Sequence, residues 1–132
     1  MKIFFDTNVV FSAIITSDGL CSQVLEKGLK EHTVIVSAEV LSELRSILKR
    51  KTSLTQKEIK EIVSAYSGVW ILTQKQKKHA VAVRDPDDQI ILERALGEGA
   101  EILITGDKDL LDIRDEIKAL KIVSPKAFLH TF

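Results

Sequence analysis

The sequence has one cysteine, few aromatic residues and no excess of charge of either sign. Cys21 is the only cysteine among 132 residues, so an internal disulfide is excluded, and no paired Cys/His spacing indicates a zinc site. Lysine plus arginine and aspartate plus glutamate both total 19, so no strongly basic balance indicates nucleic-acid binding. Any contact with nucleic acid must therefore come from a local patch.

Long hydrophobic runs and linker-like stretches are also missing. No apolar run approaches the length of a membrane span, and Asp6 comes too early for the apolar region of a signal peptide. We therefore expect a soluble, cytoplasmic protein with no membrane partner. No repeat, low-complexity tract or Pro/Gly/Ser-rich linker divides the chain, and its length suits one domain, so we predict a single domain over residues 1–132.

Short, continuous apolar runs alternate with segments of helical pattern. Such runs are typical of strands buried on both faces of a parallel sheet. Strands are predicted at 3–5, 34–36, 69–72, 102–104 and 122–123. Helices are predicted at 8–15, 20–30, 37–51, 55–66, 86–96, 110–117 and 125–129, with Gly97 and Gly99 ending the helix from 86. This alternation predicts the α/β class.

Acidic residues stand where the predicted strands and helices would bring them to one crevice. Asp6 directly follows the first strand and Asp107 follows the strand at 102–104, and ligands of open α/β sheets bind beyond the carboxyl ends of the strands. Asp88 lies two helical turns before Ala95, on the inward face of its helix. Glu43 lies at the rim of the apolar stripe of the helix at 37–51.

Simpler structural roles compete with a site at several of these positions. For Asp87 a role as helix cap or dipole partner is favoured, and Asp85 reads as a turn residue before proline. Glu43 taken alone reads as an exposed carboxylate. Asp6 differs, because a carboxylate that closes a buried strand needs partners and neither of the next two residues is a cation.

Carboxylates gathered in one crevice repel one another. At about 5 Å and an effective dielectric near 20, each pair costs roughly 3 kcal/mol. Such a cluster takes up protons or binds cations. Oxygen ligands without Cys or His favour Mg²⁺ or Mn²⁺, and four carboxylates could neutralise two such ions, an arrangement suited to phosphodiester hydrolysis.

Four motifs together resemble the PIN-domain family, and most closely its toxins from bacterial and archaeal toxin–antitoxin pairs. They are DTNVV at 6–10, SAEVLSEL at 37–44, RDPDD at 84–88 and TGDKDLL at 105–111. The resemblance implies a three-layer α/β/α sandwich with a central, mostly parallel sheet of about five strands. It also implies a metal-dependent endoribonuclease that acts on RNA, with a cognate antitoxin and a homodimer as further associations.

The resemblance carries over to individual residues. The positions that match the catalytic and metal-binding acids of the family are Asp6, Glu43, Asp88 and Asp107. Asp109 matches an accessory acid that contributes to metal binding, and Asn8 and Thr105 match positions that support the site. Many relatives carry another acid directly after the position of Asp88, whereas this chain has Gln89, which affects the number of metals more than metal binding itself.

Two basic stretches are candidates for contacting the RNA backbone. The one we predict to bind RNA is Lys49, Arg50 and Lys51, with Lys57 and Lys60 nearby in sequence; the other is Lys75, Lys77, Lys78 and His79. Two other functions remain open at this point. One is a PIN fold that binds RNA or a protein without cutting, and the other is a Mg²⁺-binding receiver-like signalling domain, which fits poorly because Asp6 is not followed by a second acid.

Overall fold

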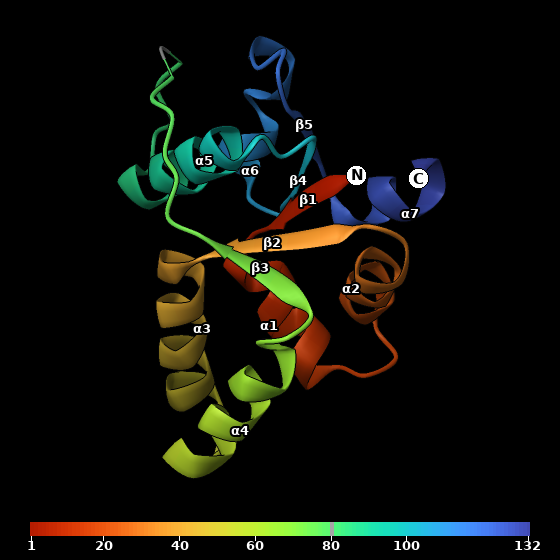
Figure 1. The fold of residues 1–132 in the computed structure, drawn as a ribbon, viewed down its shortest axis with the longest axis vertical. Helices are drawn as coiled ribbons and strands as arrows, with labels where there is room; N and C mark the ends of the chain where they lie inside the picture. Colours follow the sequence, from red (N-terminus) through yellow and green to blue (C-terminus); the bar gives the residue numbers. More distant parts are fainter. Residues whose placement is uncertain (80) are drawn as a thin grey trace.

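A computed structural model describes residues 1–79 and 81–132 and shows a five-stranded, fully parallel sheet (Figure 1). The strands are β1 (Lys2–Phe5), β2 (Thr33–Ser37), β3 (Trp70–Thr73), β4 (Ile102–Ile104) and β5 (Lys121–Val123), in the order β3-β2-β1-β4-β5. β1 is central, and its Phe4 is in register with Ile35 of β2 and Leu103 of β4. The predicted α/β class and parallel sheet are confirmed.

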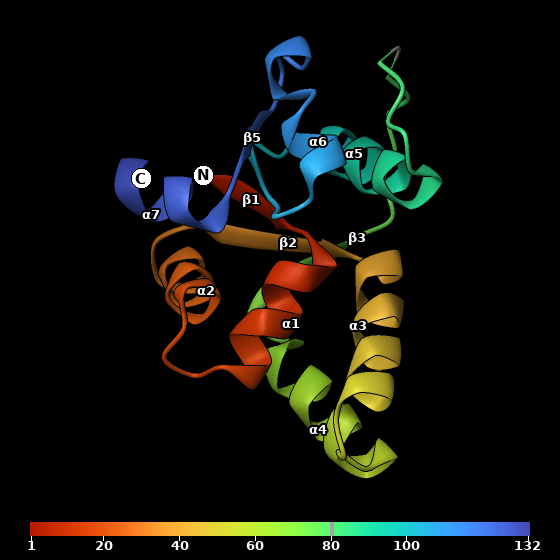
Figure 2. The same ribbon diagram turned by 180° about the vertical axis from the view of Figure 1, so that it is seen from behind.

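Helices cover both faces of the sheet, which gives the predicted three-layer architecture. They are α1 (Thr7–Ile15), α2 (Leu20–Glu31), α3 (Ala38–Lys51), α4 (Gln56–Tyr66), α5 (Pro86–Glu98), α6 (Lys108–Leu111) and α7 (Pro125–Thr131), with a 3₁₀ turn at Arg114–Glu116. α5 and α6 lie on one side of the sheet and α1, α3 and α4 on the other (Figures 1 and 2). One hydrophobic core joins both sides through the buried residues Ile3–Phe5 of β1 and Ile102–Ile104 of β4.

No single helix in the described part of the chain is long and apolar enough to cross a membrane. Only together do α1 and α2 have the length and apolar composition of a membrane span, and the two helices are bent by 106° relative to each other.

Three sequence predictions need correction. The helix predicted at 110–117 is instead the short α6 and the separate 3₁₀ turn, because Asp107 caps the helix earlier and Ile113, at φ −100° and ψ 7°, leaves the helical conformation. Gly97 does not end its helix, since α5 continues to Glu98 and Gly99, at φ 74°, ends it in the left-handed conformation.

The third correction concerns β3, whose apolar run predicts a strand buried on both faces. Ile71 and Leu72 are 43% and 52% exposed, because β3 is an edge strand. An apolar run alone does not reveal whether its strand lies at the centre or at the edge of a sheet.

Candidate metal centre

Two acids lie at the carboxyl edge of the sheet because the strands that carry them are neighbours. Asp6 follows β1 and is the N-cap of α1, while Asp107 follows β4 and is the N-cap of α6. Phe5 and Ile104, the last residues of these parallel strands, are in register. The amide of Asp6 donates a 3.0 Å hydrogen bond to the carbonyl of Ile104, which ties the two strand ends together.

Both carboxylate oxygens of Asp6 accept hydrogen bonds. The amide of Thr7 donates to Oδ1 at 2.7 Å, and the hydroxyl of Thr105 donates to Oδ2 at 2.7 Å. The Thr105 oxygen also accepts a 3.0 Å bond from the amide of Asp107, so one buried hydroxyl links the two acids. Burial raises the pKa of Asp6 most; the bonds from Thr105 and Thr7 lower that pKa, and the nearby charge of Asp107 raises it.

Asp88 lies in the first turn of α5, which Asp85 caps by accepting a 2.8 Å bond from the amide of Asp87. The Asp88 side chain points inward as predicted and is 8% exposed, and its Oδ2 has no hydrogen-bond partner among the described residues. Carboxylate oxygens of Asp88, Asp107 and Asp109 all lie within 4.8 Å of one another. Burial first, and then the carboxylates of Asp107, Asp6 and Asp85, raise the pKa of Asp88 to about 8.

These observations fit a cation at this position. A buried polar atom without a partner is costly, and clustered carboxylates repel, so a divalent ion would satisfy the first and neutralise the second. The donors around it are all oxygens, which suits a hard ion such as Mg²⁺ or Mn²⁺. We refer to Asp88, Asp107 and Asp109 as the acidic cluster.

Glu43 approaches the site from α3. Its side chain is exposed, in agreement with its predicted place at the rim of the apolar stripe, and its Oε2 accepts a 3.1 Å hydrogen bond from the hydroxyl of Thr7. Partial burial raises the pKa of Glu43 most, the Thr7 bond lowers it, and the charge of Asp6 raises it. An open cleft of about 590 Å³ lies beside Glu43, between α3 and the start of α5.

Thr7 is a residue whose role the sequence did not reveal. It is fully buried, and through its amide and its hydroxyl it bonds to both Asp6 and Glu43. The only sequence signal is its place directly after Asp6, whereas the resemblance indicates Asn8. Asn8 is exposed on α1 and makes no side-chain hydrogen bond to the described residues.

The remaining predicted residues lie outside the acidic cluster. Gln89 bonds to Val83 and Glu93 rather than to a site acid. Asp85, and not Asp87, caps α5. The predicted RNA-binding residues 49–51 form the exposed last turn of α3, two turns beyond Glu43. His79 bonds to the amide of Val81.

Comparisons with known proteins give a family match over most of the chain. A family model described as PIN domain matches residues 2–109. An uncharacterized protein of Methanocaldococcus jannaschii is 34% identical over 144 aligned positions, which cover 100% of this chain and 92% of that protein.

Solved structures show a similar fold. VapBC2 from Rickettsia felis, bound to a DNA fragment from its promoter, gives a TM-score of 0.67 at 18% identity, covering 94% of this chain and 98% of that chain. VapBC-1 from nontypeable Haemophilus influenzae gives 0.68 at 15% identity, covering 96% and 99%. The PIN domain endonuclease Utp24 gives 0.58 at 16% identity, covering 93% and 84%.

Proposed function

The chain belongs to the PIN-domain family, and on that premise we propose that it is an endoribonuclease that depends on Mg²⁺ or Mn²⁺. The observation that carries this proposal is the buried Asp88 carboxylate, whose Oδ2 has no partner among the described residues and which has an oxygen within 4.8 Å of carboxylate oxygens of Asp107 and Asp109. An acid with a purely structural role at a helix start would cap the helix or lie exposed to solvent. Asp88 does neither, because Asp85 caps α5 and Asp88 is buried.

The residues assigned to the metal and to catalysis are Asp6, Glu43, Asp88 and Asp107, with Asp109 as a further metal ligand. A divalent ion bound there would supply Lewis acidity for phosphodiester hydrolysis and activate water for attack. The protein itself fixes the orientation of its acids. The Thr105 hydroxyl bonds to Asp6 and to the amide of Asp107, so it connects these two acids. Thr7 in the same way connects Asp6 to Glu43.

RNA is the substrate that this assignment favours, and the basic end of α3 is assigned to the RNA backbone. Lys49, Arg50 and Lys51 are exposed in the last turn of α3, whose first half carries Glu43. Basic side chains outside the acidic cluster are needed to bind RNA, because the carboxylates repel its phosphates. No histidine in the described part of the chain belongs to the acidic cluster. Cleavage in which histidines act as acid and base and the RNA 2′-hydroxyl attacks therefore has no support.

We further propose that the protein acts as the toxin of a toxin–antitoxin pair and forms a complex with a cognate antitoxin. The sequence resemblance to such toxins and the fold shared with VapBC2 and VapBC-1 support this assignment. Expression in a bacterial host should arrest growth, and Asp6→Asn should restore it. A homodimer stays a prediction that sedimentation would test.

The cleavage test uses purified protein and a 5′-labelled single-stranded RNA. We expect cleavage with Mg²⁺ or Mn²⁺ that stops in excess EDTA. Asp6→Asn should be inactive, while Asp18→Asn, which changes an exposed residue in the turn between α1 and α2, should retain wild-type activity. Equal cleavage by both variants would point to a contaminating nuclease and refute the proposal, and RNA binding without any metal-dependent cleavage would favour the non-catalytic alternative.

A further inference from the structure

The segment between β3 and α5 carries a run of basic residues that the proposed site does not use. We call residues 74–79 and 81–84 the basic strap. Two strap residues bond to Glu93 of α5. The side chain of Gln76 donates a 2.6 Å hydrogen bond to Oε1 of Glu93, and the backbone amide of Lys77 donates a 2.9 Å bond to the backbone carbonyl of Glu93. Gln89 donates to the other oxygen of Glu93 at 2.9 Å. The buried Glu93 carboxylate therefore holds the strap against α5.

Further contacts hold the start of the strap. Arg94 of α5 donates to the backbone carbonyls of Gln74 and Lys75, and its guanidinium also forms a 3.0 Å ion pair with Glu39 at the start of α3. At Gly97 an added Cβ would lie 2.6 Å from the backbone nitrogen of Gln76, so the strap crosses α5 where only glycine fits.

The far end of the strap is held beside the acidic cluster. The amide of Val83 donates a 2.7 Å hydrogen bond to Oε1 of Gln89, which directly follows Asp88. The strap is followed directly by Asp85, the N-cap of α5. It thus follows α5 backwards, from near Gly97 to the helix start that carries Asp88.

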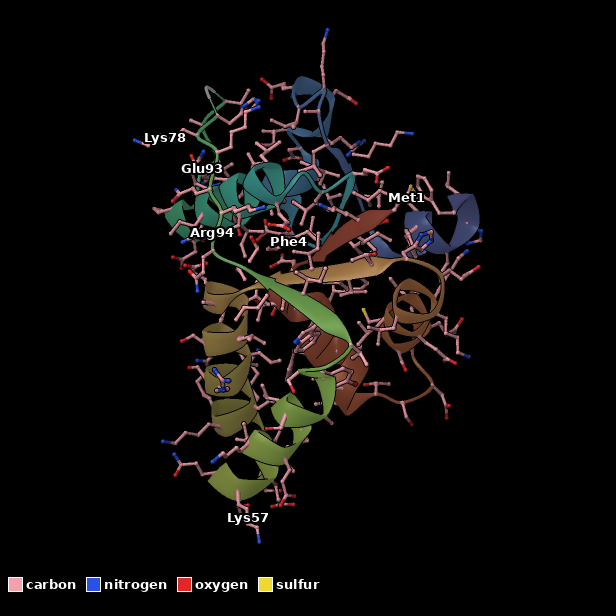
Figure 3. The ribbon with its side chains drawn as sticks, viewed as in Figure 1. Met1, Phe4, Lys57, Lys78, Glu93 and Arg94 are labelled. Carbon is pink, nitrogen blue, oxygen red and sulfur yellow. The ribbon has the colours of Figure 1, made fainter. Side chains whose placement is uncertain are left out.

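The charged side chains of the strap are turned outward. Lys75, Lys77, Lys78 and Arg84 are exposed, and Figure 3 shows Lys78 directed away from the molecule while Glu93 and Arg94 lie beneath the strap. Lys75 pairs with Glu98 at 3.7 Å. Lys77, Lys78 and Arg84 form no ion pair with the described residues.

We propose that the basic strap binds the phosphate backbone of single-stranded RNA and leads it to the acidic cluster. The inference rests on the proposed function, because it takes RNA as the substrate. A centre of several carboxylates repels a phosphodiester, and fixed cations next to it offset that repulsion. Between residues 74 and 79 no side chain is aliphatic or a large aromatic, so this stretch offers little for an apolar protein interface.

The test measures RNA binding without cleavage. Wild type, Lys77→Gln/Lys78→Gln and the control Lys2→Gln/Lys121→Gln are titrated onto a labelled RNA oligonucleotide in EDTA, over a series of salt concentrations. The control removes the same charge from exposed lysines at the starts of β1 and β5, at the opposite edge of the sheet from the cluster.

We expect the strap variant to bind several-fold more weakly and its salt slope to drop by about 1.4, which is about 0.7 for each phosphate of a single strand that the variant no longer neutralises. The control should match wild type. Equal losses of affinity in both variants would show a general effect of net charge and overturn the proposal. Unchanged binding by the strap variant would also overturn it.

A second variant tests whether the fixed position of the strap matters. Glu93→Gln keeps every strap lysine but removes the charged acceptor beneath it. We expect weaker binding with an unchanged salt slope, and faster hydrogen exchange at residues 75–79; wild-type affinity in this variant would contradict the role of Glu93. RNA binding is measured in EDTA, whereas cleavage is measured with metal. The two assays therefore test the strap proposal and the proposed function separately, and either can fail without the other.

Discussion

Replacing Asp88 by Asn should make the metal-free protein more stable, and increasingly so as the pH rises. Burial and the neighbouring acids raise the pKa of Asp88 from 3.8 to about 8 in the folded protein. Between these values the folded state keeps a proton that the unfolded state releases. The free energy of unfolding therefore falls as pH rises, by up to about 1.4 kcal/mol per pH unit for this one group.

The magnitude of the difference follows from that slope. Asn takes up no proton, so Asp88→Asn loses the contribution of Asp88, while other acids with raised pKa values, such as Asp6, act equally in both proteins. Between about pH 4.5 and 7 the variant should gain up to roughly 3 kcal/mol relative to wild type. For a domain of this size, that corresponds to a difference in melting temperature on the order of 10 °C.

Metal should reverse the ranking. A divalent ion that binds only the folded wild type adds about 2.7 kcal/mol at a hundredfold excess over its Kd, and Asp88→Asn, which lacks one ligand, should gain less. The variant should also lose cleavage.

The assay is a set of urea or thermal unfolding curves at several pH values, with EDTA and with Mn²⁺. Asp18→Asn, which removes an exposed carboxylate far from the cluster, serves as the matched control and should follow wild type. Parallel pH curves for wild type and Asp88→Asn in EDTA, or equal gains with Mn²⁺, would refute the metal-site interpretation of Asp88.

Four other expected outcomes concern the reaction products, the basic end of α3 and two single residues. Cleavage products should carry 5′-phosphate and 3′-hydroxyl ends, as end-labelling would show, and 2′,3′-cyclic phosphates would contradict attack by water. Replacing Lys49, Arg50 and Lys51 together by alanine should weaken RNA binding and flatten its salt dependence. An unchanged slope would mean that these residues are exposed without contacting RNA. Thr105→Val removes the hydroxyl bound to Asp6 and should lower kcat by about tenfold or more, at a stability cost of roughly 1.5 to 3 kcal/mol, and wild-type turnover would exclude a positioning role. Gly97→Ala should destabilise by about 1 to 3 kcal/mol in urea unfolding, whereas Gly68→Ala, with nothing near its added Cβ, should not.

The sequence by itself determined the alternation of strands and helices along the chain, the mostly parallel character of the sheet and the inward face of Asp88. These follow from local patterns, since continuous apolar runs indicate buried parallel strands and a spacing of two turns places residues on one helix face. The sequence also placed Asp6 and Asp107 at one edge, because carboxyl ends of parallel strands share an edge.

Only the tertiary structure decided the contacts between residues distant in the chain. The bond from Thr7 to Glu43 spans 36 positions and the bond from Thr105 to Asp6 spans 99, and nothing in local sequence specifies either. Likewise, the local pattern at Gly97 predicts a helix end, whereas α5 continues past it and the need for glycine there comes from the nearby backbone of Gln76. The exposure of Ile71 and Leu72 depends on which strand occupies the edge of the sheet. Local patterns fix which face of an element is apolar, whereas its neighbours are fixed by packing of the whole chain.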